Sequence, residues 1–209
     1  MKPRNTLAVS AALALASLSA PAMAQSAGDW TLGVGLHSVD PKSDNGTLAG
    51  TLRADVDDDI KPTITAEYFI RDNLGIEVLA AAPFKHDISL DGVKAGETRH
   101  LPPVVSLQYH FNSAGRVSPF LGLGVNYTRF FEEKSDADGP LAGARLKLDG
   151  SWGLAAHAGL DFRLGESGAL RVDARWIDIE TDVSVEGLGH VGSAKLDPIV
   201  YGVAYVWKF

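Results

Sequence analysis

The sequence has no cysteine, no excess of positive charge and, beyond its first two dozen residues, no long apolar run. Without cysteine among its 209 residues, the chain can have no disulfide framework, thiolate metal site or cysteine nucleophile. Lys and Arg number 19 against 26 Asp and Glu, and the net charge of −7 argues against binding to nucleic acid. No later stretch approaches the roughly 18 consecutive apolar residues that a membrane-spanning helix needs.

Residues 1–24 have the pattern of a signal peptide. Lys2 and Arg4 precede an apolar run from Leu7 to Ala20, and Pro21-Ala-Met-Ala24 supplies the small residues that a signal peptidase reads. We therefore expect cleavage after this segment and export of residues 25–209. Loss of the two basic residues lowers the net charge from −7 to −9. The mature length fits a single domain.

Eight segments show the period-two alternation that is typical of half-buried β-strands. In the first, Trp30, Leu32 and Val34 share one face, and small or polar residues occupy the other. The eight segments are residues 30–37, 60–70, 74–81, 103–111, 119–127, 153–163, 170–176 and 199–209. None of the sequence has the pattern of a long helix.

The connections between these segments alternate in length. Tight turns rich in Gly, Asn and Asp occur at residues 71–73, 112–116 and 165–168, and long polar links occupy residues 39–59, 84–99, 131–150 and 181–196. Short turns at one end and long loops at the other are typical of an outer-membrane barrel. We therefore predict an all-β fold, an eight-stranded antiparallel transmembrane β-barrel with short periplasmic turns and long external loops. Both termini then lie on the periplasmic side.

The last segment carries the clearest membrane pattern. Tyr201, Tyr205 and Trp207 lie on one face, whereas the other face has small residues and Lys208. This suits a strand with lipid outside and a packed lumen inside. An edge strand of a soluble sandwich would fit this segment alone about as well, but would not explain the sorting of the loops.

Seven stretches of the mature chain form a specific ordered set. They are residues 61–69 (KPTITAEYF), 73–77 (NLGIE), 101–111 (LPPVVSLQYHF), 119–127 (PFLGLGVNY) and 151–153 (SWG), then Asp197-Pro198 and the terminal Phe209. In this order they resemble the OmpW family of small outer-membrane barrels, and Phe209 resembles the C-terminal assembly signal of such barrels. The resemblance implies an eight-stranded barrel with a narrow apolar lumen that passes small hydrophobic compounds across the outer membrane.

Parity along each strand assigns the residues that face the lumen. Near the short turns, these residues carry charges of both signs: Glu67, Glu77, His110, Asp161, Arg163, Arg171 and Asp173. Unpaired charges would be unfavourable in so narrow a space, so we expect these groups to pair and close the floor of the lumen.

Nearer the long links, the inward residues are apolar: Leu79, Ala81, Val104, Ala155, Ile177 and Val200. An eight-stranded barrel holds only its own side chains or one small ligand. Inward Gly and Ala in four of the strands suggest room for one, so we predict an apolar pocket that opens to the outside.

Trp176 is a further candidate for this pocket, and its facing stays open. The resemblance implies a lumenal tryptophan that narrows the passage at this position. Parity with Leu170, Val172 and Ala174 instead places the ring outward, as an anchor at the membrane–water boundary. A single bulge in the strand would reverse the answer.

The sequence thus predicts a barrel for passive uptake of small hydrophobic molecules, with sideways exit into the membrane where prolines weaken strand pairing. The candidate prolines are Pro62, Pro102, Pro103, Pro119 and Pro198; the alternative for each is that it merely ends a strand or marks a bulge. The alternative is a sealed structural or adhesive barrel that acts through its external loops. We expect a monomer that contacts membrane lipid, lipopolysaccharide and small hydrophobic solutes, without nucleic acid or cofactor.

An enzymatic role is not expected. His86, Asp87 and Ser89 have the residue types of a nucleophilic triad, but neighbours in one loop are not thereby oriented for catalysis. Residues 55–59 (DVDDD) offer oxygens to Ca²⁺ but lack the spacing and the Gly of a calcium loop. The histidines show no metal-ligand spacing, so no metal site is predicted.

Overall fold

The computed structural model describes residues 25–209, so the expected signal peptide lies outside the described residues. The described chain contains fifteen strands. Within it, no helix is long and apolar enough to cross a membrane. Eight strands run the length of the wall: β1 (Trp30–Asp40), β4 (Asp59–Arg71), β5 (Leu74–Ala81), β8 (Val104–His110), β9 (Val117–Ser135), β11 (Ser151–Arg163), β12 (Gly168–Ile177) and β15 (Ile199–Lys208).

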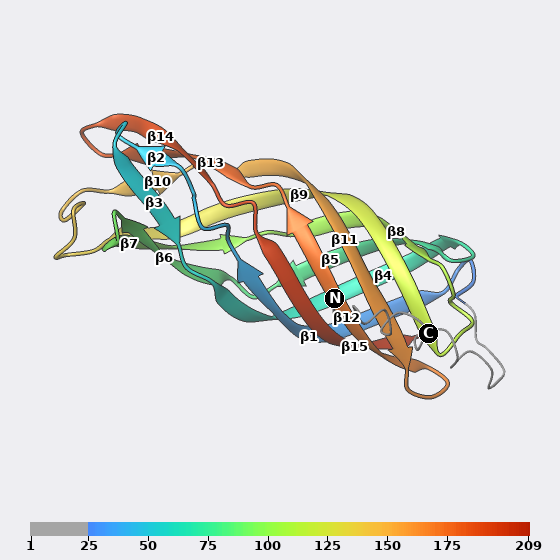
Figure 1. The fold of residues 1–209 in the computed structure, drawn as a ribbon. Coiled ribbons are helices and arrows are strands. Elements are labelled where there is room, and N and C mark those ends of the chain that lie inside the picture. Colours follow the sequence, from blue (N-terminus) through green and yellow to red (C-terminus); the bar gives the residue numbers. More distant parts are fainter. Residues whose placement is uncertain (1–24) are drawn as a thin grey trace, which may run out of the picture.

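These eight strands close into an antiparallel barrel. Their spatial order is β1-β4-β5-β8-β9-β11-β12-β15, and β15 returns to pair with β1 (Figure 1). At the junction, the N–H of Phe209 donates to the carbonyl of Trp30 at 2.8 Å, which ties the last residue to the first strand. Closure leaves the eight-stranded wall without a free edge, which is where strands of another chain would otherwise pair. The predicted eight-stranded barrel is confirmed.

In the closed barrel, alternate residues of each strand point to the lipid and to the interior, as the sequence predicts. Large apolar residues such as Leu123 and Val203 are exposed on the outer wall, whereas their sequence neighbours point inward. Aromatic pairs mark both ends of this outer surface. The ring centroids of Trp30 and Tyr68 lie 4.9 Å apart near the short turns, and those of Tyr127 and Trp152 lie 4.7 Å apart near the long connections. Such aromatic girdles bound the membrane-crossing band of a barrel.

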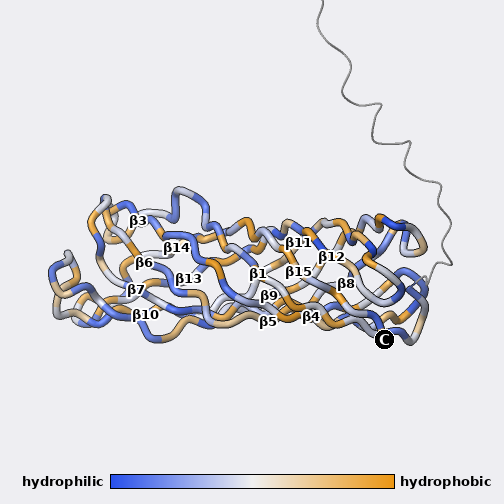
Figure 2. Tube along the Cα trace, turned by 90° about the horizontal axis from the view of Figure 1, so that it is seen from below, coloured by the Kyte–Doolittle hydropathy of each residue, from blue (hydrophilic) through white to orange (hydrophobic). Residues whose placement is uncertain are grey.

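The four long connections contain strands that extend the barrel at one end (Figures 1 and 2). Their seven strands are β2 (Thr47–Leu48), β3 (Leu52–Val56), β6 (Phe84–Leu90), β7 (Val93–Leu101), β10 (Leu146–Leu148), β13 (Glu180–Val185) and β14 (Gly189–Lys195). We call these strands, together with residues 129–135 of β9, which pair with β7, the extension. One sheet continues from β9 through β7, β6 and β3 to β2, and a separate sheet contains β10, β13 and β14.

One apolar cluster fills the interior from the upper barrel into the extension. The barrel contributes Val39, Leu79, Val104, Ala155, Ile177 and Val200, and the extension contributes Phe84, Ile88, Leu90, Phe130, Leu146 and Val183. The extension strands alternate like the barrel strands, with apolar residues inside. The interior is therefore mainly apolar from the middle of the barrel to its external end, although some polar side chains, such as His86 and His100, are buried in it.

Candidate functional site

The lower half of the barrel interior contains a buried cluster of charged and imidazole groups, which we call the charged floor. Its members are Glu67, Glu77, Asp161, Asp173, Arg171, Arg175, His37, His110 and His157. Six strands supply these groups, so their contacts join the wall across the lumen.

Arg171 lies at the centre of the charged floor. Its Nε and Nη2 donate to the two carboxylate oxygens of Asp161 at 2.7 and 2.9 Å, and its Nη1 donates to Glu77 Oε2 at 2.7 Å. A third carboxylate, that of Glu67, lies 3.7 Å away. The guanidinium also lies 4.4 Å from the centroid of the Phe120 ring, a cation–π contact. One buried cation therefore lies among carboxylates from three different strands, β4, β5 and β11.

Arg175 is the second cation of the charged floor. Its Nη2 donates to Glu77 Oε1 at 2.7 Å, so each oxygen of Glu77 accepts from a different arginine. Its Nη1 lies 3.4 Å from the hydroxyl of Ser106. The Nδ1 of His157 approaches the same Glu77 oxygen at 3.8 Å. Glu77 is thus the acceptor that links both arginines.

Each histidine of the floor lies beside a carboxylate. His37 Nε2 is 3.4 Å from Asp173, and its Nδ1 is 2.6 Å from the Thr63 hydroxyl. His110 Nε2 is 3.1 Å from Glu67, within a network that includes Gln108. Four carboxylates face only two guanidinium groups, so the carboxylates of the floor outnumber its arginines.

The structure brings together six of the seven residues that the sequence placed in the floor. The seventh, Arg163, is the last residue of β11, and its guanidinium donates to the carbonyls of Ser113 and Ala114 in the turn between β8 and β9. Sequence reasoning missed Arg175, His37 and His157, although the parity that identified Arg171 applies to them. Sorting the inward residues by height assigned Arg175 to neither set, whereas its side chain donates to Glu77 within the floor.

The expected room at inward glycines is not present. At Gly122, a Cβ atom would overlap the imidazole of His157, and at Gly202 it would overlap His37 and Asp173. The glycines accommodate side chains from neighbouring strands, and a larger residue would displace part of the floor. The prediction that these positions leave space for a solute is wrong.

The apolar candidates lie above the floor. Leu79, Val104, Ala155, Ile177 and Val200 point inward, are each at most 5% exposed and belong to the apolar cluster. Ala81 is partly buried against the same cluster. The structure therefore brings these six positions together as one apolar region.

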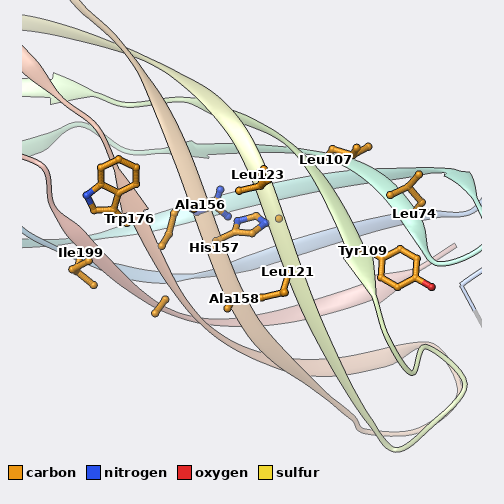
Figure 3. A pocket seen from close by; sticks show the side chains of 13 residues that line it. Leu74, Leu107, Tyr109, Leu121, Leu123, Ala156, His157, Ala158, Trp176 and Ile199 are labelled. Carbon is orange, nitrogen blue, oxygen red and sulfur yellow. The ribbon is translucent and has the colours of Figure 1, made fainter.

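Trp176 does not join them. Its side chain is 40% exposed on the outer wall, so the lumenal position implied by the family resemblance is wrong here. Strand β12 pairs regularly with β11 and β15 through this residue, without the bulge that would have turned the ring inward. Trp176 instead lines a pocket of about 630 Å³ on the outer wall, together with Ala156 and Ala158 (Figure 3).

The residues weighed as a catalytic triad are separated by strand geometry. His86 points into the interior of the extension, whereas Asp87 points outward and pairs with Lys94 at 2.7 Å. Neighbours on a strand face opposite sides, so these groups are not assembled around one reacting atom. Within residues 25–209, no three His, Asp or Glu side chains are grouped so that they could hold a metal ion.

Comparison with known proteins identifies the family. The OmpW family model matches residues 26–209. Outer membrane protein W of Vibrio cholerae serotype O1 is 37% identical over 214 residues, covering 97% of both chains. The crystal structure of OprG from Pseudomonas aeruginosa, 32% identical, superposes with a TM-score of 0.79 and covers 89% of this chain and 98% of that one. The dibenzothiophene metabolism operon protein PahQ of Pseudomonas aeruginosa is 28% identical, covering 92% of this chain and 93% of its own. The chain therefore belongs to the OmpW family, and its barrel lies in the outer membrane.

Proposed function

We propose that this protein passively takes up small apolar molecules, which enter the extension from outside and leave sideways into the membrane. The observation that carries the proposal is the apolar interior, which runs from the external end down to the level of Leu79 and Val104. Apolar solutes partition into such an interior because it removes their surface from water. Ions are disfavoured there for the same reason.

The charged floor is the reason for proposing a sideways exit. An apolar solute that continued toward the periplasm would have to separate Arg171 from Asp161 and Glu77, which are joined at 2.7 to 2.9 Å. Separating buried ion pairs without replacing their partners is strongly unfavourable. Leaving through the wall avoids that step.

The wall has a weak line between the upper part of β9 and β10, which belong to separate sheets. Here Ser135 Oγ donates to the carbonyl of Ala144 at 2.5 Å, and the N–H of Leu148 lies 3.4 Å from Glu133 Oε1. We call this line the seam. Side chains rather than a backbone ladder provide these bonds, and the seam lies beyond the paired residues Thr128 and Ser151. The seam begins just outside the Tyr127–Trp152 girdle, so we propose that a solute leaves there into the lipopolysaccharide at the outer boundary of the membrane.

The prolines are less suitable as exits than expected. Pro62 keeps its place in the register opposite Leu36, and Pro119 keeps its place opposite Leu160. The carbonyl of Pro103 accepts from the side chain of Asn126 at 2.9 Å. Strand pairing therefore continues past Pro62 and Pro119, which do not mark the proposed opening. Pro102 and Pro103 lie between β7 and β8, and Pro198 lies between β14 and β15, so these three end strands rather than interrupt them.

The relative PahQ supports an apolar solute, because its name refers to the metabolism of dibenzothiophene, an apolar aromatic compound. We propose that this protein works on solutes of that class. A barrel closed by one chain needs no second copy, so we propose a monomer, with lipopolysaccharide around the extension.

The test compares Ala155→Phe with Ala156→Phe in cells that otherwise lack the protein. Ala155 points into the apolar interior, whereas Ala156 adds the same bulk on the lipid side. Uptake of a radiolabelled alkane should fall severalfold with A155F and stay at the wild-type level with A156F. Folded barrel in the outer membrane must be equal in both strains, because overpacking can itself destabilise a protein.

The seam is tested with a crosslink. Cysteines in place of the exposed Lys134 and Lys147, joined by a short bismaleimide, would tie β9 to β10 across the seam, and no native cysteine competes. The matched control joins Lys85 and Arg99, which face each other in the existing β6–β7 ladder. Uptake should stop only with the seam crosslink. Unchanged uptake in the crosslinked protein would place the exit elsewhere.

The packing of the apolar cluster favours a second candidate, a sealed barrel with a structural or adhesive role. Its barrel and extension residues contact one another and are almost fully buried. This alternative predicts that cells without the protein take up alkane as fast as cells with it. It also predicts that exchanging the extension strands, but not A155F, changes adhesion.

A further inference from the structure

Two buried histidines interrupt the apolar interior of the extension. His86 on β6 and His100 on β7 point inward, are both 0% exposed, and have ring centroids 4.7 Å apart. The rings of Phe84 and Phe130 lie edge-on to His100, at 5.7 and 5.6 Å. The pair is therefore a small polar spot enclosed by aromatic rings.

The contacts of His86 fix which of its nitrogens carries the proton. Its Nδ1 lies 2.5 Å from the backbone carbonyl of Asp57, and a carbonyl oxygen can only accept a hydrogen bond. Nδ1 must therefore be the donor. Burial lowers the pKa of His86, so the ring is neutral at neutral pH and its Nε2 is a bare acceptor. This Nε2 is buried and has no partner in the protein.

His100 offers the complementary group. Neither of its ring nitrogens has a hydrogen-bond partner in the protein, although both are buried. Burial lowers the pKa of His100 well below its usual value, so its neutral ring has one N–H donor and one acceptor. Buried polar atoms are nearly always hydrogen-bonded, and three unsatisfied nitrogens in one place point to a ligand.

The chemistry of the pair restricts that ligand. The bare Nε2 of His86 needs a donor, and the N–H of His100 needs an acceptor. A hydroxyl group can donate to the first and accept from the second, whereas an ether or ketone can only accept. The aromatic and aliphatic surroundings require that the remainder of the molecule be apolar.

We propose that His86 and His100 bind the hydroxyl group of an aliphatic alcohol whose tail lies in the apolar cluster. The inference rests on the proposed uptake function and deepens it, since it names a preferred solute class. A metal ion fits less well, because no third His, Asp or Glu of the described chain completes a metal site here.

Binding is tested with two isomers of equal size and composition, 1-octanol and 1-methoxyheptane. The protein, carrying ¹⁵N-labelled histidine, is reconstituted in lipid nanodiscs and titrated with each compound. The imidazole ¹⁵N resonances of His86 and His100 should shift with 1-octanol at about tenfold lower concentration than with 1-methoxyheptane, as expected for one net hydrogen bond. Equal responses to both compounds, or none, would overturn the proposal; no response means that the pair binds water only.

The variants His86→Phe and His100→Phe remove the polar nitrogens and keep a flat ring. Each should abolish the preference for 1-octanol, measured on the resonance of the remaining histidine. His190→Phe, on exposed β14, is the matched control and should keep it. A preference that survives both H86F and H100F would exclude the pair as the binding site.

Uptake by cells separates this inference from the proposed function. Wild-type cells should take up 1-octanol faster than 1-methoxyheptane, and cells with H100F should take up both at one rate. If no solute enters through the protein while the octanol-specific resonance shift persists, the uptake function fails and the binding site stands. If alkane uptake is normal and the two isomers bind equally, the uptake function stands and the binding site fails.

Discussion

The strongest quantitative prediction concerns the substitution Arg171→Met. Methionine keeps much of the apolar stem of arginine but removes the guanidinium that donates to Asp161 and Glu77. The substitution leaves these buried carboxylates without their shortest partner. Arg175→Met is the comparison, because Arg175 donates to Glu77 alone among the carboxylates, and Glu77 keeps Arg171.

The magnitude follows from the contacts that each substitution removes. Removing one partner of a buried ion pair lowers the free energy of unfolding by about 3 to 5 kcal/mol. Arg171 has two short carboxylate partners and a cation–π contact, so R171M should lie near 5 kcal/mol at the top of this approximate range. R175M should lie near the lower end, about 3 kcal/mol. Both values are large against a typical domain stability of about 5 to 15 kcal/mol.

The assay is urea unfolding of the barrel in phospholipid vesicles, followed by the gel-mobility difference between folded and unfolded chains. Arg99→Met is the matched control, since Arg99 pairs with Glu132 at 3.1 Å on the exposed surface of the extension. An exposed pair contributes at most about 1 kcal/mol. If R171M, R175M and R99M all changed stability by this small amount, the floor would be hydrated, and the argument for a closed floor would fail.

Three further predictions follow from individual side chains. Gly122→Val should destabilise the barrel in the same urea assay, because the new side chain overlaps His157, whereas Gly150→Ala, whose Cβ comes no closer than 3.1 Å to the Tyr127 hydroxyl, should have a smaller effect. Burial lowers the pKa of His86 and His100, so their contribution to stability is complete above the unfolded pKa of about 6.5 and is lost as pH falls toward the folded values. The protection of amides in β6 and β7, measured as the exchange rate relative to its intrinsic value at the same pH, should therefore be weaker at pH 5 than at pH 7. Stronger protection at pH 5 would contradict this sign. A variant that keeps Trp176 as its single tryptophan should be quenched strongly by brominated acyl chains, and weak quenching would mean that the ring faces inward.

The barrel could be predicted from the sequence because strand parity and closure reinforce each other. The face of β15 that carries Val203, Tyr205 and Trp207 must lie on the same side of the wall as the apolar faces of β1 and β12, because these strands pair with β15. A register error of one residue would turn a whole apolar face inward. This constraint made the facing of the barrel strands predictable, including the outward position that parity gave Trp176.

The extension was less predictable because its strands are short and lie within polar sequence. Residues 84–90 alternate Phe, His, Ile and Leu inside with Lys, Asp and Ser outside, but this pattern was included in a link. Composition marked the segment as a loop, whereas its period marked it as a strand. The structure follows the period, because each extension strand finds a pairing partner and an apolar interior.

Glycine in the lumen was misread for a related reason. From sequence, an inward glycine is an absence of side chain and suggests space. In the structure, that space is occupied by groups from other strands, as the imidazole of His157 packs over Gly122. Whether a glycine provides a cavity or accommodates a neighbour depends on cross-strand register, which one sequence segment does not contain.

In the proposed function, the charged floor and the apolar interior have two separate tasks within one barrel. The floor links strands by directional bonds, since Arg171 on β12 reaches Asp161 on β11 and Glu77 on β5 across the lumen. Apolar packing above it has no such direction, and a solute of the same chemistry can replace part of it at little cost. A barrel held in shape by its floor could therefore exchange its upper contents without losing its register. This division predicts that R171M should reduce stability at every solute concentration, whereas A155F should reduce uptake with a much smaller loss of stability. If the two variants could not be separated in this way, the upper interior would itself be part of the structural core.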